Sequence, residues 1–174
     1  SRFVGNAIPI EDLTRIIRKT YTEDVFQSPD ITPIEHVLPG VWIQDLSQGP
    51  SLAFKDLAMQ FLGHVMDYEL NRQDRYLRIL GASSGDTVSA AEEAMRSKSR
   101  VSVIMLTPKT GMSEFQKAQA GSILDDNIYN ISIPGSFDVC QDIVKEINRD
   151  PEFKQRYSIG AVNSINWGRI VAQI

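Results

Sequence analysis

From Pro50 onward, short apolar runs alternate with amphipathic segments, and this alternation limits the possible folds more than any other feature of the chain. The apolar runs have the length of buried strands, and the segments between them repeat apolar residues at helical spacing. We expect strands at 75–80, 101–106 and 128–133, and helices at 52–70, 87–96, 113–124 and 138–148. Strands joined in this order by right-handed crossovers build a parallel sheet with helices on both faces. The sequence therefore predicts an α/β domain over residues 51–174.

One of the expected helices carries a specific start signal. Ser113 is followed three residues later by Gln116, which is the spacing of a capping box. In this arrangement each side chain accepts a hydrogen bond from the other residue's backbone N–H group, so we expect the helix at 113–124 to begin there.

The first fifty residues follow a different pattern. Pro9 and the two acidic residues after Ile10 are typical of a helix start. The proline-rich stretch 28–40 is expected to be extended, with short strands at 37–38 and 41–43 on either side of a turn. We expect an α+β segment over residues 1–50 that belongs to another part of a longer protein.

Both ends of the sequence suggest a piece of a longer polypeptide. The chain starts with Ser1 and lacks the basic-then-apolar order of a signal peptide. It stops on the apolar residue Ile174 without a helix-ending signal. We therefore expect truncation at both ends.

The composition excludes several classes of function. Lys and Arg number 18 against 22 Asp and Glu, so the net charge of −4 does not favour binding of nucleic acid through its phosphates. The only cysteine, Cys140, has no partner for a disulfide, and two distant histidines make a zinc site improbable. No apolar run approaches the ~18–20 residues of a membrane span. We expect a cytoplasmic protein without metal.

The segment 81–87, Gly-Ala-Ser-Ser-Gly-Asp-Thr, is the first of two candidate binding segments, because it follows an expected strand and precedes a helix. Ligands of open parallel sheets bind at this edge. The glycines permit close backbone approach, and a helix N-terminus suits an anion. The segment is neither a P-loop nor a dinucleotide-binding fingerprint. The alternative is an ordinary turn in which a side chain caps the helix.

The segment 48–56, Gln-Gly-Pro-Ser-Leu-Ala-Phe-Lys-Asp, is the second candidate. Lys55 is expected in the first turn of a helix among apolar residues, and both conditions favour the neutral amine. A neutral amine is what covalent bonding to an aldehyde requires. The alternative is a surface lysine paired with Asp56.

Four segments of the chain resemble the threonine synthase family, in the family's order. Residues 48–56 are similar to its lysine motif, and residues 81–88 to its Gly-Ala-Thr-Ser-Gly-Asp-Thr-Gly motif. Residues 137–144 and 162–170 match its later Phe-Asp-Asp-Cys-Gln and Asn-Ser-Ile-Asn-Trp segments. One such segment would be weak evidence, whereas four in order make the resemblance specific.

This resemblance implies the smaller domain of a fold type II enzyme that uses pyridoxal 5'-phosphate. The implied reaction converts O-phospho-L-homoserine and water to L-threonine and phosphate. By the same carry-over, Lys55 bonds the cofactor covalently and then moves protons among the substrate carbons. The resemblance also implies a carboxylate loop beside the cofactor, with Asp86 in contact with both, and a clamp for the substrate's phosphate: Ser83, Ser84, Asp86 and Thr87 in the loop, and Asn163, Ser164 and Arg169 in the clamp.

Three positions depart from the family pattern: Gln48 in place of His, Ser83 in place of Thr, and Val88 in place of Gly. Because a branched residue does not readily adopt a positive φ, either position 88 is helical in the family or this loop is altered. The sequence also has no further glycine-rich loop to hold the cofactor's phosphate, so we expect these residues to form one side of an active site.

Two other interpretations remain open. A truncated relative that only binds ligands is favoured slightly by Gln48 and Val88. A related lyase acting on threonine or serine is disfavoured by the phosphate clamp, because those substrates carry no phosphate.

Overall fold

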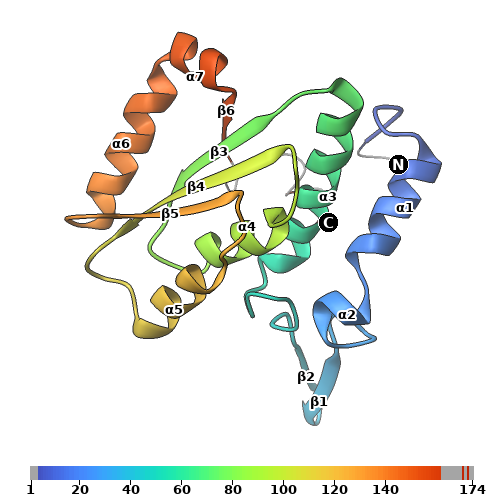
Figure 1. Cartoon of the computed structure of the whole chain (residues 1–174). Helices are drawn as coiled ribbons and strands as arrows, with labels where there is room; N and C mark the ends of the chain where they lie inside the picture. Colours follow the sequence, from blue (N-terminus) through green and yellow to red (C-terminus); the bar gives the residue numbers. More distant parts are fainter. Residues whose placement is uncertain (1–3, 162–169, 171, 173–174) are drawn as a thin grey trace.

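The structure is a computed structural model that describes residues 4–161, 170 and 172. Its centre is a four-stranded parallel sheet in the order β5-β4-β3-β6 (Figure 1). The strands are β3 (Leu77–Ala82), β4 (Val101–Pro108), β5 (Ile128–Ile133) and β6 (Ile159–Gly160). Each strand from β3 to β5 leads into a helix, as the alternation in the sequence predicts.

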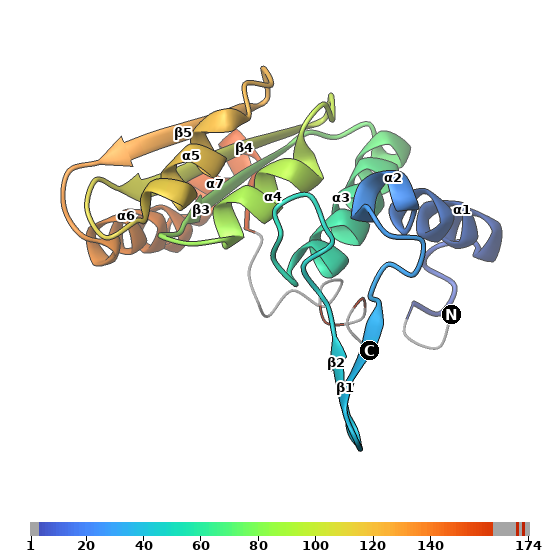
Figure 2. The same ribbon diagram turned by 90° about the horizontal axis from the view of Figure 1, so that it is seen from below.

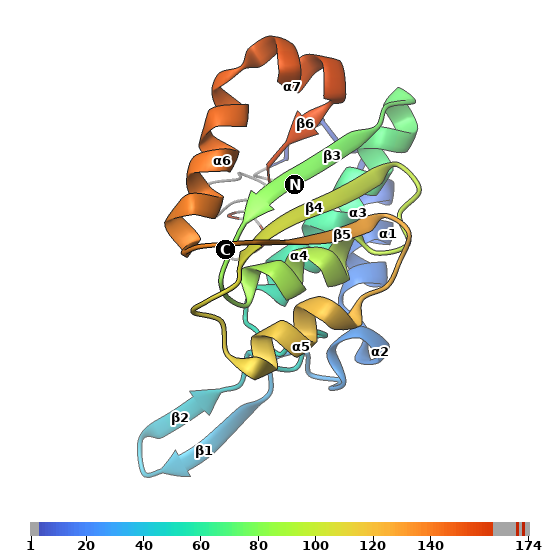
Figure 3. The same ribbon diagram turned by 60° about the vertical axis from the view of Figure 1, so that its left-hand side comes forward.

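Helices cover both faces of this sheet (Figure 3). One face carries α3 (Asp56–Gln73), α4 (Thr87–Met95) and α5 (Glu114–Ser122), and the other carries α6 (Phe137–Arg149) beside α7 (Pro151–Tyr157). Neighbouring residues of β3 show why two helical layers are needed, because Ile79 packs with α3 and α4 whereas Leu80 packs with Cys140 of α6. The predicted α/β architecture is confirmed.

The element boundaries differ from the predicted ones at the start of α3. The helix expected from residue 52 begins at Asp56, because Leu52 adopts a φ of +59° and cannot be part of a right-handed helix. The residues before it form turns instead. The predicted strand at 75–80 is shifted to Leu77–Ala82, whereas the strand at Ile128–Ile133 and the capping box of Ser113 and Gln116 are as predicted.

The amino-terminal segment contains α1 (Ile10–Thr20), the short α2 (Glu23–Phe26), and a hairpin of β1 (Ile34–Leu38) and β2 (Val41–Gln44). α1 lies along α3 (Figure 2), where Leu13 and Ile16 pack against Phe61. The hairpin extends away from the sheet, and every residue of its two strands is exposed. Among the residues that the structure describes, no helix is long and apolar enough to cross a membrane.

Candidate functional site

Lys55 lies immediately before α3, at the end of the turns formed by residues 49–54. Its side chain is only 16% exposed, and its Nζ atom is 2.8 Å from Oδ2 of Asp86. The same ammonium group lies 4.8 Å from the centre of the Phe54 ring. The alternative in which Lys55 pairs with Asp56 is wrong, because the Asp56 carboxylate is buried and accepts hydrogen bonds from Ser51.

The loop after β3 supplies the other half of this contact. Gly81, near the end of β3, pairs with Met105 of β4, and a Cβ atom on it would lie 3.0 Å from the methionine sulfur. Ser83 then folds the loop back, because its Oγ atom accepts a hydrogen bond from the backbone N–H of Gly85 at 3.2 Å. The hydroxyl-bearing residues of the loop are half-buried, so they remain accessible from outside: Ser83, Ser84 and Thr87.

Asp86 occupies the position before α4, where a helix-capping side chain is expected. It makes no capping hydrogen bond, and its side chain, which is 47% exposed, instead points to Lys55. The interpretation of this loop as an ordinary capped turn therefore does not account for Asp86. The only polar partner that the structure gives its carboxylate is the Lys55 ammonium group, among the residues described.

Helix packing brings these two loops together, although 31 residues separate Lys55 from Asp86. α3 and α4 start at the same end of the sheet and lie against each other. Gly63 of α3 faces the backbone carbonyl of Ala94 in α4 so closely that a Cβ atom on Gly63 would be 2.3 Å from that oxygen. The absence of a side chain at Gly63 thus sets how near the two helix starts come.

The structure explains the departure at position 88 and shows the contact that Gln48 makes. Val88 lies in the first turn of α4, is fully buried, and is not among the residues with positive φ. Its backbone is helical, so a branched residue fits there and the loop is not altered by it. Gln48 donates a hydrogen bond of 2.6 Å from Nε2 to Asp45, whose pKa is held low by hydrogen bonds from Ser47 and from Gln48.

The predicted phosphate clamp falls outside the residues that the structure describes. Asn163, Ser164 and Arg169 all lie in the stretch 162–169. Their grouping with Lys55 and Asp86 therefore remains a prediction.

Two residues next to the site were not singled out from the sequence. Ser51 is 4% exposed, and its carbonyl oxygen accepts a hydrogen bond from Gln119 of α5 at 3.0 Å. Neither residue carries a signal in the sequence, since a serine in a turn and a glutamine in a helix are ordinary. The one available hint was Gly49, because glycine permits a close approach of the backbone to a neighbouring group.

Comparison with known proteins finds relatives along the whole chain. It is 49% identical over 174 residues to threonine synthase from Corynebacterium glutamicum and 51% identical over 181 residues to that of Methylobacillus glycogenes. All of this chain is covered in both cases, but it spans only 36% and 38% of those proteins. No family model matches the chain.

Solved structures give the same relationship. The pyridoxal-phosphate-bound threonine synthase from Brucella melitensis superimposes with a TM-score of 0.93 and 38% identity, covering 99% of this chain and 37% of that one. Yeast threonine synthase gives a TM-score of 0.89 at 40% identity, with 97% of this chain and 35% of that chain covered. O-ureido-L-serine synthase, at 18% identity and a TM-score of 0.52 over 74% of this chain and 40% of that one, shares the fold alone.

A parallel sheet covered on both faces, with a lysine held against the loop after its first strand, places the chain in the fold type II class. Within that class, the chain belongs to the threonine synthase family. It corresponds to little more than a third of the length of these relatives.

Proposed function

We propose that the protein containing this chain is a threonine synthase, which converts O-phospho-L-homoserine and water to L-threonine and phosphate with pyridoxal 5'-phosphate as cofactor. The observation that carries the proposal is the 2.8 Å contact between Lys55 and Asp86, which joins two of the family's sequence motifs at one point. The relatives at 49% and 51% identity support it, as does the pyridoxal-phosphate-bound relative. A cytoplasmic location accords with the single cysteine.

The residues around Lys55 fit this cofactor. A primary amine that bonds an aldehyde must be enclosed enough to be directed and open enough to be reached, and Lys55 is 16% exposed beside a half-exposed carboxylate. Pyridoxal phosphate, when bound, supplies the electron sink for the reaction. Lys55 would hold the cofactor in place and then carry protons to and from the substrate carbons.

The loop between β3 and α4 would bind the substrate's carboxylate. Hydroxyl groups of Ser83, Ser84 and Thr87, together with the helix start behind them, are donors suited to an anion. Asp86 is itself an anion and would repel a carboxylate, so we assign it to the amine side of the site. There its charge would hold the Lys55 ammonium group at the edge of the loop.

Lys55 can be tested directly in the whole protein. Borohydride reduction of the cofactor-bound protein followed by peptide mapping should place the pyridoxyl label on Lys55. Lys55→Ala should remove the cofactor's visible absorbance and the release of phosphate from O-phospho-L-homoserine together. The matched control is Lys145→Ala, which changes an exposed lysine that also pairs with a carboxylate. A label on another lysine would reject the assignment, and a protein that binds the cofactor without turnover would favour a binding module.

Arg169, Asn163 and Ser164 are proposed to hold the substrate's phosphate as it leaves. A guanidinium group binds a phosphate through two parallel hydrogen bonds, and an amide and a hydroxyl add direction. Arg169→Ala should therefore cost on the order of 2–4 kcal/mol of transition-state stabilisation. Arg169→Lys should recover only part of this, because an ammonium group cannot form the paired contact.

The measurement for the clamp is steady-state kinetics on O-phospho-L-homoserine, beside slow deamination of serine or threonine as a reaction without phosphate. The Arg169→Ala variant should slow the first reaction far more than the second. Equal slowing of both would mean that Arg169 has a structural role.

A further inference from the structure

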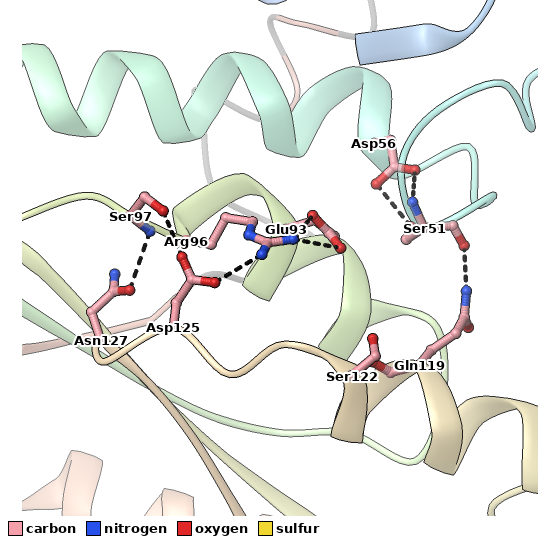
Figure 4. A network of polar contacts seen from close by, with 9 residues as sticks. All are labelled: Ser51, Asp56, Glu93, Arg96, Ser97, Gln119, Ser122, Asp125 and Asn127. Atoms are coloured by element: carbon pink, nitrogen blue, oxygen red, sulfur yellow. Dashed lines mark hydrogen bonds and ion pairs between the residues drawn. The ribbon is translucent and has the colours of Figure 1, made fainter. Parts of the chain in front are cut away.

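Ser51 is held from two sides by side chains of different helices (Figure 4). On one side, the Asp56 carboxylate accepts hydrogen bonds from the Ser51 backbone N–H and from its hydroxyl, each at 2.8 Å. On the other side, Nε2 of Gln119 donates to the Ser51 carbonyl oxygen at 3.0 Å. The backbone N–H, the hydroxyl and the carbonyl group of this one loop residue are therefore all engaged.

The loop also fits closely around the Asp56 carboxylate. A Cβ atom on Gly49 would be 2.4 Å from Cβ of Asp56 and 2.5 Å from its Oδ2 atom, so only glycine fits this position in the present arrangement. Burial raises the pKa of the Asp56 carboxyl, and the hydrogen bonds from Ser51 act against this by favouring the charged form. Ser51 thus stabilises the charge of the buried carboxylate, and the carboxylate in turn fixes the position of Ser51.

This arrangement determines where Lys55 points, because Lys55 and Asp56 are adjacent at the start of α3. Successive side chains at a helix start leave the axis in different directions. With the Asp56 side chain turned inward to Ser51, the Lys55 side chain is directed across the loop to Asp86. Leu52, which lies between Ser51 and Asp56, adopts a positive φ, so the backbone turns sharply directly after the residue that is held.

α5 contacts both halves of the site. Gln119 binds Ser51 in the lysine loop, and Gln116, one helical turn earlier, has its Nε2 atom 3.6 Å from the place of a Cβ atom on Gly85 in the other loop. One helix face is thus in touch with the segments that carry Lys55 and Asp86. A change in the Gln119 contact would shift the first segment relative to the second.

We propose that Asp56 and Gln119 are positioning residues for Lys55, which they set in reach of Asp86 by holding Ser51 from opposite sides. The effect on catalysis rests on the proposed function, whereas the contact of the Lys55 amine with Asp86 is seen in this chain itself. Neither residue touches the reacting atoms.

The decisive variant is Gln119→Glu in the whole protein. It keeps the shape of the side chain but replaces the donor to the Ser51 carbonyl with an ionised acceptor. We expect kcat to fall on the order of 10–100-fold with KM changed less than about twofold, because a small displacement of a catalytic group has effects of this size. Gln155→Glu, on the exposed helix α7, is the matched control and should leave kcat unchanged.

A second pair of variants tests the other side of Ser51. Ser51→Ala removes the hydroxyl that donates to Asp56, whereas Ser51→Thr keeps it. We expect Ser51→Ala to lower kcat in the same way as Gln119→Glu and Ser51→Thr to retain most of the activity. Variants are compared at a temperature where circular dichroism shows each of them folded.

A measurement without cofactor separates this proposal from the proposed function. In the cofactor-free protein, acetic anhydride labels accessible amines, and peptide mapping gives the extent of labelling of each lysine. Lys55 should be labelled more in Gln119→Glu and Ser51→Ala than in the wild type, because its amine is no longer held against Asp86, while the labelling of Lys145 stays constant. If the variants lose thermal stability but keep the wild-type kcat and Lys55 labelling, the positioning role is wrong. If the Lys55 labelling rises in a protein that shows no turnover of O-phospho-L-homoserine, the positioning role stands and the proposed function fails.

Discussion

Glu92 is a fully buried carboxyl group on α4, and neither of its oxygens has a hydrogen-bond partner among the residues described. Burial raises the pKa of Glu92 to about 8. The nearby Asn130 side chain acts against this, and the charge of Glu93 acts in the same direction as burial. The group is therefore neutral in the folded protein below that pH, although an unfolded chain would ionise it near 4.5.

This difference makes the stability of the fold depend on pH. Between pH 4.5 and about 8 the unfolded chain releases a proton that the folded chain keeps, so the free energy of unfolding falls as the pH rises. The decline should amount to roughly 2–4 kcal/mol. Glu92→Gln, which cannot ionise, should flatten it.

Urea unfolding of the chain at pH 5 and pH 8 measures this difference. Glu146→Gln on the exposed side of α6 is the control and should retain the wild-type slope. A Glu92→Gln variant that loses stability with pH as steeply as the wild type would show that Glu92 is not the source.

Sequence reasoning at the scale of single residues identified Lys55 but not its partner. The nearest acid along the chain, Asp56, was the expected alternative, whereas the observed partner is Asp86. The direction of the Lys55 and Asp56 side chains depends on where α3 begins. That start follows from the positive φ of Leu52 and the contacts of Ser51, which the sequence does not indicate. The two-sided contact of Ser51 with Asp56 and Gln119 could not be predicted, because it requires the packing of α5 against the loop.

At the scale of elements, α3 and α4 approach each other closely at Gly63. Gly63 lies eight residues after Lys55, and Ala94 lies eight residues after Asp86. At ~1.5 Å per residue, this contact is about 12 Å from the two helix starts. A side chain at Gly63 would therefore separate the helices close to the ion pair.

Gly63→Ala should destabilise the fold by about 1–3 kcal/mol, because the added Cβ atom meets backbone rather than a flexible side chain. It should also alter the labelling profile of Lys55, since the distance to Asp86 changes. The matched control is Gly121→Ala on α5, where a Cβ atom meets nothing within 4 Å.

The control should stabilise the helix by about 0.5–1 kcal/mol through the lower backbone entropy of alanine in the unfolded chain. Thermal unfolding of both variants gives the comparison. Equal effects of the two substitutions would show that α3 and α4 separate without cost.

Most elements were predictable because their signals are local. The periodicity of apolar residues gave β3 to β5 and α3 to α6, and the capping box gave the start of α5. The start of α3 was wrong by four residues, since a positive φ at a leucine has no signal in the sequence. α7 was not predicted, although the Asp150 carboxylate caps it by accepting a hydrogen bond from the Phe153 N–H and Pro151 occupies its first turn.

For the whole molecule, the sheet and its two helical layers supply a core of their own. Buried residues from α3, α4, α5, β3, β4 and β5 form one cluster, and a second joins the sheet to α6. The hairpin contrasts with this, because Trp42 is 65% exposed and Ile34 is 61% exposed. An isolated two-stranded hairpin is only marginally stable in water.

We therefore expect the 174-residue chain, expressed alone, to fold at least from residue 50 onward and to bind pyridoxal phosphate weakly. The fold follows from the two core clusters. Weak binding follows because the sequence has no second glycine-rich loop to hold the cofactor's phosphate. Circular dichroism measures the folding, and equilibrium dialysis with pyridoxal phosphate measures the binding. Tight binding of one cofactor per chain would contradict this expectation.

The close fit between Gly49 and Asp56 limits which substitutions these two positions can accept during evolution. Any larger residue at position 49 collides with the aspartate, so position 56 would have to become smaller first. That first step would remove both acceptors of Ser51 and release the loop. A replacement at position 49 alone creates the collision, and a replacement at position 56, alone or combined with one at 49, loses the hydrogen bonds to Ser51. Mutations that arrive one at a time therefore leave the pair as it is.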